Sequence, residues 1–166
     1  AAGSIGSEIV RQVVQFKPHS IVLVDQGETP LHQLTLELET IVTESNIHSV
    51  IADVRNKEVM RRVFGTYSPQ VVYHAAAYKH VPLMEENPSQ AIQTNVEGTK
   101  NVADLACEFK VKKFVMVSTD KAVNPSNVMG ASKRIAEKYV QSLQLRSVKE
   151  NNGKGTKFIT TRFGNV

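Results

Sequence analysis

The sequence has little of several features that mark whole classes of protein. Only one cysteine, Cys107, occurs among the 166 residues, so no internal disulfide can form. We therefore expect Cys107 to be a small core residue in a protein of a reducing compartment. No apolar run approaches the roughly 18 residues of a membrane-spanning helix, so we expect no membrane contact from these residues.

Charge of a single sign is also scarce. The net charge is +4, acidic and basic residues are interspersed, and the short basic run at 110–113 contains no aromatic residue. This pattern indicates a solvated helix end, and we expect no nucleic-acid partner. Hydrophobic residues make up 41% and charged residues 22% of the chain, which predicts one globular domain over residues 1–166 with a sizeable core.

Strand-like and helix-like stretches alternate along the chain. Alternation of this kind predicts βαβ units with right-handed crossovers, and hence an α/β fold with a doubly wound, Rossmann-like parallel sheet. The β-branched, apolar runs predict strands at 20–25, 49–54, 70–77, 112–119 and 157–163. Helical patterns occupy 4–16, 29–45, 56–65, 88–109 and 129–148.

The first helical pattern opens with a glycine turn, although no strand precedes it. Gly3 and Gly6 fit the last two glycines of a G-x-x-G-x-x-G loop whose first glycine would fall just before Ala1. We therefore expect the sheet to lack its first strand here. The free N–H groups at Gly3, Ser4, Ile5 and Gly6 are candidates to bind the pyrophosphate of a dinucleotide.

Acidic residues follow the next two predicted strands. Asp25 can accept hydrogen bonds from the adenosine ribose and repel a 2′-phosphate, which favours NAD over NADP. The alternative is that Asp25 only caps the next helix. Asp53 can meet the adenine amino group, with Val54 packed on the ring, or it can simply form a turn.

The strand predicted at 70–77 ends in small residues. Ala75, Ala76 and Ala77 leave room for a dinucleotide to cross the end of the strand. Lys79 and His80 are candidate phosphate or substrate contacts, or else exposed loop charges. Asn95 lies in the next helical pattern, where a polar side chain facing the sheet needs a partner, and we count it among the cofactor-binding candidates.

The segment 118–133, STDKAVNPSNVMGASK, carries the candidate chemistry. Thr119, Asp120 and Lys121 follow Ser118 at the end of a strand, where ligands bind in doubly wound sheets. Met129 and Lys133 are four residues apart and share a helix face. A thioether cannot transfer a proton, so any acid–base chemistry must come from the neighbours of Met129.

Six motifs together resemble a known family: AAGSIGSEIVRQ, HAAAYKHVPLMEENP, TNVEGT, STDKAVNP, MGASK and RFGNV. They are similar to the extended short-chain dehydrogenases/reductases, and within these to the UDP-N-acetylglucosamine 4,6-dehydratases of bacterial polysaccharide biosynthesis. The resemblance extends to the capsular polysaccharide branch, in which Met replaces the usual Tyr of Y-x-x-x-K.

The resemblance implies a reaction and a role for each residue. Bound NAD takes a hydride from sugar C4, the C5 proton and the C6 hydroxyl are lost, and the hydride returns to C6. It implies that Lys121 is the base, Asp120 the acid, and Thr119 the partner of the C4 oxygen. Lys133 would hold the nicotinamide ribose, Met129 would take the position of the Tyr, and Asn165 would contact the substrate.

Three alternatives remain at this point. The acceptor of the C4 hydroxyl proton is either Asp120, acting through Thr119, or a water molecule. The same residues also fit C4 or C5 epimerisation of a UDP-sugar, and the chain could instead be a non-catalytic NAD-binding domain. We expect no metal.

The resemblance also implies a larger protein. We expect the chain to be an inactive fragment of a longer, homo-oligomeric enzyme that continues into a substrate-binding part. The domain would lie in the bacterial cytoplasm, with its parent anchored in the inner membrane.

Overall fold

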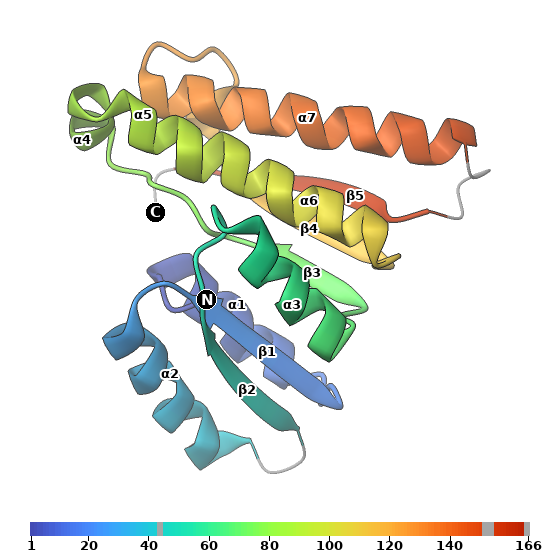
Figure 1. The fold of residues 1–166 in the computed structure, drawn as a ribbon. Helices are drawn as coiled ribbons and strands as arrows, with labels where there is room; N and C mark the ends of the chain where they lie inside the picture. The colour runs from blue at the N-terminus through green and yellow to red at the C-terminus, as the bar shows by residue number, and fades with distance from the viewer. Residues whose placement is uncertain (43–44, 151–154, 165–166) are drawn as a thin grey trace. The chain divides into compact units, whose positions relative to one another are not determined.

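The computed structural model describes residues 1–42, 45–150 and 155–164, and two compact units divide the chain. Unit 1 comprises Ala1–Asp53 and unit 2 comprises Val54–Val166 (Figure 1). The strands within each unit are parallel, which confirms the predicted parallel α/β architecture.

Unit 1 consists of two helices and two strands. These are α1 (Ser4–Val14), β1 (Ser20–Asp25), α2 (Glu28–Ile41) and β2 (Asn46–Ile51). Strand β1 pairs with β2 from Ser20↔Asn46 to Asp25↔Ile51. The leucines of α2 recur at helical spacing and pack on β1, which creates the core of Val10, Leu23, Leu31, Leu34 and Leu38.

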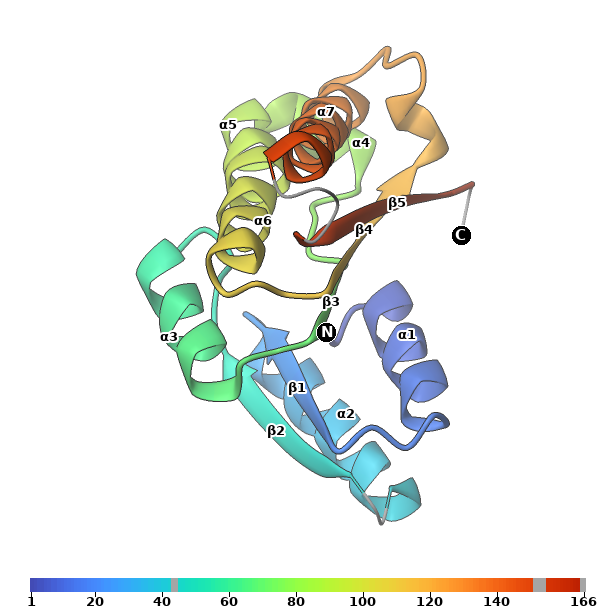
Figure 2. The ribbon, with the colours of Figure 1, turned by 90° about the vertical axis from the view of Figure 1, so that its right-hand side faces the viewer.

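Unit 2 contains a three-stranded sheet in the order β3-β4-β5. Along the chain its elements are α3 (Lys57–Tyr67), β3 (Val71–His74), α4 (Val81–Glu86), α5 (Pro88–Ala91), the π-helix η1 (Ile92–Gly98), α6 (Thr99–Glu108), β4 (Lys113–Thr119), the 3₁₀-helix η2 (Asp120–Ala122), α7 (Val128–Glu150) and β5 (Lys157–Phe163). Helices α6 and α7 pack on each other and lie side by side on one face of this sheet (Figure 2).

The core of unit 2 lies between this sheet and its helices. Phe114 of β4 is fully buried, and its ring centroid lies 5.4 Å from that of Phe158 on β5. The ring of His74 at the end of β3 lies 5.9 Å from Phe114 on the other side. The sheet therefore carries aromatic packing across all three strands, beneath the strand ends that hold the candidate chemistry.

Several predicted boundaries were wrong. The strand predicted at 49–54 lies three residues earlier, at Asn46–Ile51. Its polar first residues become strand because they pair with β1, and the pairing ends at Ile51. The strand predicted at 70–77 ends at His74, so Ala75–Ala77 form an extended loop. The predicted helix 88–109 is three segments, α5, η1 and α6, and α4 was not predicted at all. Cys107 was expected in the core and is instead exposed, because it lies in the last turn of α6, outside the buried face that includes Leu105 and Ala106.

Candidate active site

Thr119, Asp120 and Lys121 form one hydrogen-bonded cluster at the carboxyl end of β4. Thr119 Oγ1 donates to Asp120 Oδ1 over 2.9 Å, and the Lys121 backbone N–H donates to the same oxygen over 2.8 Å. Lys121 Nζ lies 3.5 Å from Asp120 Oδ1. The side chains of Asp120 and Lys121 are 53% and 36% exposed, so both can reach a substrate.

The electrostatics of this cluster favour a carboxylate. The hydrogen bond from Thr119, with a further contribution from the charge of Lys121, holds the pKa of Asp120 below its usual range, although desolvation opposes this. Asp120 is therefore ionised near neutral pH. It can act as an acid only after it gains a proton, which a bound ligand must promote.

The start of α7 approaches this cluster closely. A Cβ atom placed on Gly130 would lie 2.5 Å from the carbonyl oxygen of Lys121, so only glycine allows the approach. The first turn of α7 is capped by Asn127, whose Oδ1 accepts from Gly130 N over 2.7 Å, and by Glu85, whose Oε1 accepts from Val128 N over 2.6 Å. These caps fix the helix beside the turn that holds Lys121.

Met129 is part of the apolar core, where it is only 3% exposed. It packs with Met84 of α4 and Ala91 of α5, and the partly buried Tyr78 and Val81 pack against this cluster. No proton transfer by Met129 is possible, as its thioether chemistry already implied. The residue instead joins α7 to the two short helices that follow the alanine loop.

Lys133 lies one turn further along α7, with an exposed fraction of 4%. Its Nζ donates to the Val117 carbonyl of β4 over 2.7 Å. Burial lowers the pKa of Lys133 to about 8, and the charge of Glu137 opposes this effect. The ammonium group is therefore protonated near neutral pH and close to losing its proton.

Asn95 is fully buried and holds the alanine loop in place. Its Oδ1 accepts from Tyr78 N over 2.8 Å, while its Nδ2 donates to Tyr78 O over 3.0 Å and to Ser132 Oγ over 2.9 Å. Both amide hydrogens are thus engaged within the protein, which gives Asn95 a positioning role. The predicted contact of Asn95 with the cofactor stays a prediction.

A second buried chain of hydrogen bonds lies beside Asn95. Thr99 Oγ1 donates to Asn95 O over 2.7 Å, so it must accept from His74 Nε2 over 2.8 Å. Nε2 of His74 therefore carries a proton, and the lowered pKa of the ring makes His74 neutral near pH 7. Burial, helped by the charge of Lys133, lowers the pKa of His74 to about 3. This interaction at the end of β3 was not predicted, because nothing in the sequence near His74 indicates that its side chain pairs with Thr99, 25 residues away.

In unit 1, the start of α1 offers free backbone donors. Its N-cap is Gly3, which makes no side-chain cap, and no acidic residue lies in the first turn. A Cβ on Gly3 would meet nothing within 4 Å, whereas one on Gly6 would lie 2.4 Å from the Ala1 carbonyl oxygen. The open turn at Gly3, Ser4 and Ile5 therefore fits an anion, and Gly6 fits close packing.

Asp25 joins this turn to the start of α2. Its Oδ2 lies 2.8 Å from Ala1 N and accepts from Ala2 N over 2.7 Å, while its Oδ1 accepts from Gly27 N over 2.9 Å. Burial raises the pKa of Asp25, but these hydrogen bonds together lower it by more, so the pKa is below its usual range. A carboxylate of this kind supports the turn before α2 and retains lone pairs for ribose hydroxyls.

The remaining candidate residues lie in the loops and strand ends around these elements. Asp53 and Val54 are half-buried in the segment after β2. Asp53 was predicted at the end of a strand, but β2 ends two residues earlier, at Ile51. Lys79 and His80 are exposed, and His80 is the N-cap residue of α4. Ser118 is 5% exposed, and Asn165 lies outside the described residues. The roles of these residues stay predictions.

The described residues contain neither a cluster of metal-ligand side chains nor a membrane-spanning helix. Within residues 1–42, 45–150 and 155–164, no three His, Cys, Asp or Glu side chains gather in a way that could hold a metal ion. In the same part of the chain, no helix is both long and apolar enough to cross a bilayer.

Comparison with known proteins gives a family match over the whole chain. The model of a family described as "Polysaccharide biosynthesis protein" matches residues 1–166. The chain is 55% identical to the capsular polysaccharide biosynthesis protein CapD of Staphylococcus aureus, over 100% of this chain and 27% of CapD. It is 38% identical to a UDP-N-acetylglucosamine 4,6-dehydratase (inverting) of Campylobacter jejuni, over 99% of this chain and 46% of that protein.

Solved structures share the fold. The structure of Pen from Bacillus thuringiensis is 34% identical with a TM-score of 0.87, over 99% of this chain and 48% of that one. The dTDP-glucose 4,6-dehydratase DesIV from Streptomyces venezuelae, solved with NAD bound, is 20% identical with a TM-score of 0.80, over 97% of this chain and 52% of that one. The chain thus spans between about a quarter and a half of the length of these relatives.

Proposed function

The chain belongs to the polysaccharide biosynthesis protein family, and we propose that it forms the NAD-binding domain of a longer nucleotide-sugar 4,6-dehydratase. The proposed substrate is a UDP-sugar of the UDP-N-acetylglucosamine class. The similarity to a dehydratase of this specificity supports the reaction. The similarity to CapD supports a place in surface polysaccharide biosynthesis.

The observation that carries the proposal is the cluster of Thr119, Asp120 and Lys121. A base and an acid share one exposed turn, with Nζ of Lys121 and Oδ1 of Asp120 3.5 Å apart. A domain that only binds NAD has no use for such a pair. Because dehydration needs a base at C5 and an acid at the C6 hydroxyl, this pair supplies both groups to one sugar ring.

The cofactor adds the redox chemistry: bound NAD supplies a hydride acceptor for C4 and a donor for C6. The protein residues then perform the remaining steps. Asp120 takes up the C4 hydroxyl proton through Thr119 as the hydride leaves C4, and it gives a proton to the C6 hydroxyl, which departs as water. Lys121 removes the C5 proton, which the ketone at C4 acidifies, and returns a proton to C5 when the hydride is delivered to C6. Thr119 hydrogen-bonds the C4 oxygen, and Lys133 holds the nicotinamide ribose through its ammonium group.

Unit 1 by itself carries groups of the kind that bind the pyrophosphate and adenosine of NAD. The uncapped start of α1 at Gly3, Ser4 and Ile5 supplies N–H donors for the pyrophosphate. The ionised Asp25 supplies acceptors for the adenosine ribose and would repel the 2′-phosphate of NADP. We therefore propose NAD as the cofactor.

One observation favours a second candidate, C4 or C5 epimerisation of a UDP-sugar. The pKa of Asp120 lies below its usual range, so the carboxyl is a poor acid in the absence of ligand. An epimerase needs no acid at C6. If substrate binding did not raise this pKa, the C6 hydroxyl would be retained.

Product analysis separates the candidates. The complete protein is incubated with NAD and UDP-N-acetylglucosamine, and the product is identified by mass spectrometry and NMR. We expect a 4-keto-6-deoxy sugar that has lost one water. A 4-epimer or a C5-epimer with its C6 hydroxyl intact would establish the epimerase, and NAD binding without turnover of any UDP-sugar would indicate a non-catalytic domain.

The location and assembly of the protein are also proposals. We propose a domain on the cytoplasmic face of the bacterial inner membrane, as part of a homo-oligomer. Fractionation of cells that express the complete protein, followed by light scattering of the purified protein, tests both. Recovery of the complete protein in the soluble fraction would contradict the membrane anchor, and a monomer would contradict the oligomer.

A further inference from the structure

We propose that Glu137 is a positioning residue for the reaction, which ties the Lys133 face of α7 to the sheet and maintains the positive charge of Lys133. The inference rests on the proposed function, because it concerns the lysine assigned to the nicotinamide ribose. Glu137 matches none of the motifs recognised in the sequence. Its role follows from its burial and from the charged groups around it.

Glu137 is a carboxylate with no exposed side-chain surface. Its Oε1 accepts from Arg162 Nε over 2.9 Å, and its Oε2 accepts from Arg162 Nη2 over 2.8 Å. Arg134 Nη1 lies 3.4 Å from Oε2. This bidentate pair ties α7 to β5. Burial has the largest single effect on the pKa of Glu137 and raises it, but Arg162, Ser118 and Arg134 together lower it by more, so the carboxylate stays ionised.

Lys133 and Glu137 lie one helical turn apart, so both project from the same face of α7. That face packs on the sheet: Lys133 Nζ donates to Val117 O of β4, and Glu137 binds Arg162 of β5. Arg162 lies opposite Ser118 in the β4–β5 register, one residue after Val117 along β4. The two charged side chains are therefore anchored to neighbouring points of the two strands.

Other groups near Lys133 do not supply a negative charge. His74, on β3, is neutral, because its pKa is lowered to about 3. Arg134 and Arg162 are cations, and each lies against Glu137. Burial alone would drive Lys133 toward its neutral form, and Glu137 is the group whose charge opposes that effect. Loss of the carboxylate would leave the effect of burial on Lys133 unopposed, and would leave Arg134 and Arg162 without their carboxylate partner.

The test is the pH dependence of NAD affinity in the complete protein, measured by calorimetry in wild type and in Glu137→Gln. Glutamine keeps the shape and removes the charge, and Arg162 is 38% exposed, so its guanidinium can turn to water. In wild type, affinity should fall as pH rises through about 8, where Lys133 loses its proton. In Glu137→Gln the fall should occur at least about one pH unit lower, since a nearby opposite charge moves a pKa by ~1–3 units.

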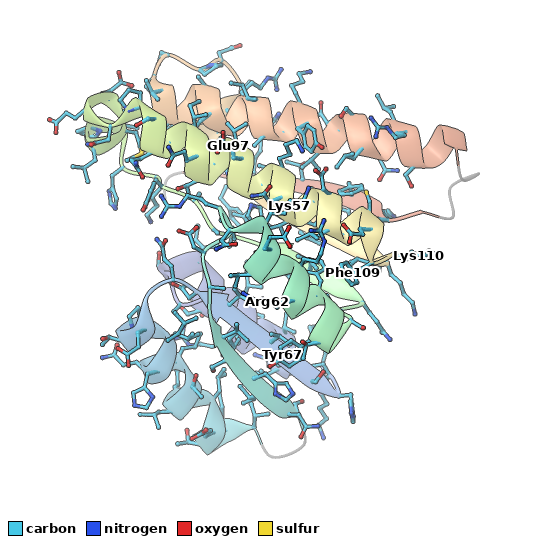
Figure 3. The ribbon with its side chains drawn as sticks, viewed as in Figure 1. Lys57, Arg62, Tyr67, Glu97, Phe109 and Lys110 are labelled. Atoms are coloured by element: carbon cyan, nitrogen blue, oxygen red, sulfur yellow. The ribbon has the colours of Figure 1, made fainter. Side chains whose placement is uncertain are left out.

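A matched control removes the same charge elsewhere in unit 2. Glu97 is an exposed carboxylate on η1, in the continuous helical stretch that leads into α6 (Figure 3). Glu97→Gln should leave both the affinity and its pH midpoint unchanged. A fall in NAD affinity of Glu137→Gln by one factor at every pH, with no change in midpoint, would show a merely structural role and overturn the inference.

A second variant covers the possibility that Glu137→Gln does not fold. Lys133→Arg keeps a positive charge throughout this range, so the pH midpoint near 8 should disappear. A midpoint that persists in Lys133→Arg would overturn the inference, because another group would then be titrating. If wild type bound no NAD at any pH, the proposed function itself would fail, whereas NAD binding with an unchanged midpoint in Glu137→Gln would refute this inference alone.

Discussion

At the scale of single residues, the side chains around Lys121 divide into exposed groups and buried groups. Thr119, Asp120 and Lys121 meet solvent and share one hydrogen-bonded turn. Met129 and Asn95 are buried: Met129 packs with Met84 and Ala91, and Asn95 donates a hydrogen bond to Tyr78 O. Met129 therefore supplies packing beneath the site and no proton donor to it.

We expect Met129 to contribute volume. Met129→Leu largely preserves volume and should cost less than about 1.5 kcal/mol of stability, with turnover nearly unchanged. Met129→Ala leaves a cavity beside Met84 and Ala91 and should cost about 2–5 kcal/mol. Chemical denaturation and steady-state kinetics of both variants measure these effects. Abolished turnover in a stable Met129→Leu protein would show that the thioether has a chemical role.

At the scale of elements, the relation between η2 and α7 sets the geometry of the site. The 3₁₀-turn Asp120–Ala122 and the first turn of α7 touch through backbone atoms, with no room for a side chain at Gly130. Asn127 and Glu85 hold the start of α7 from two sides. A small displacement of this helix would move the Lys121 backbone directly.

A pair of glycine substitutions tests this contact. In Gly130→Ala the added Cβ would lie 2.5 Å from the Lys121 oxygen, so the backbone must move, and turnover should fall by up to about 10²-fold. Gly65→Ala in α3 is the matched control, because its Cβ would lie 3.8 Å from the ring of Phe109, which Figure 3 labels at the end of α6.

The control should gain about 0.5–1 kcal/mol of stability, as alanine favours a helix interior, and keep its activity. Kinetics and thermal unfolding of the two proteins measure both effects. Equal activity of Gly130→Ala and Gly65→Ala would show that the close approach at Gly130 is not needed for turnover.

Elements whose residues favour a strand or helix by themselves were predicted well, and elements that form only through contacts with distant residues were not. The strands at 20–25 and 157–163 were predicted with their bounds, because β-branched runs mark them. The strand Asn46–Ile51 was misplaced since its polar residues become strand only through pairing with β1. The π-helix η1 was not predicted, and its last residue, Gly98, packs closely on a residue distant in sequence: a Cβ on Gly98 would lie 2.6 Å from Val54 Cγ2.

The site was predictable to the same extent. The cluster at 119–121 and Lys133 were candidates from the sequence, because the cluster follows one predicted strand and Lys133 lies on the next predicted helix. The buried partners could not be. Arg162 is 25 residues from Glu137, and His74 is 25 residues from Thr99, so their hydrogen bonds form only in the folded protein.

At the scale of the whole molecule, buried polar groups link stability to pH. His74 is buried in its neutral form, with its pKa lowered to about 3 by burial and by Lys133. In the unfolded chain its pKa returns to about 6.5, so the unfolded state binds the additional proton between these values. Stability should therefore rise with pH across this window and fall as pH drops below about 6.5.

We expect this effect to amount to roughly 1.4 kcal/mol per pH unit below about 6.5, or about 2 kcal/mol by pH 5. His74→Gln keeps a donor for Thr99 and should remove this part of the pH dependence. His32→Gln, at an exposed position on α2, is the control and should retain it. Urea unfolding of the three proteins at pH 7 and pH 5 measures it, and an unchanged slope in His74→Gln would contradict the assignment.

The most direct test of the account is the fate of the C5 proton. The complete protein is supplied with NAD and UDP-N-acetylglucosamine in heavy water, and the product is examined by NMR. We expect a 4-keto-6-deoxy sugar that carries deuterium at C5, because Lys121 removes that proton and exchanges it with solvent. Lys121→Ala should lose about 10²- to 10⁴-fold in rate, as is typical for loss of a general base. A 4-epimer with its C6 hydroxyl retained, or full dehydration by Lys121→Ala, would contradict the account.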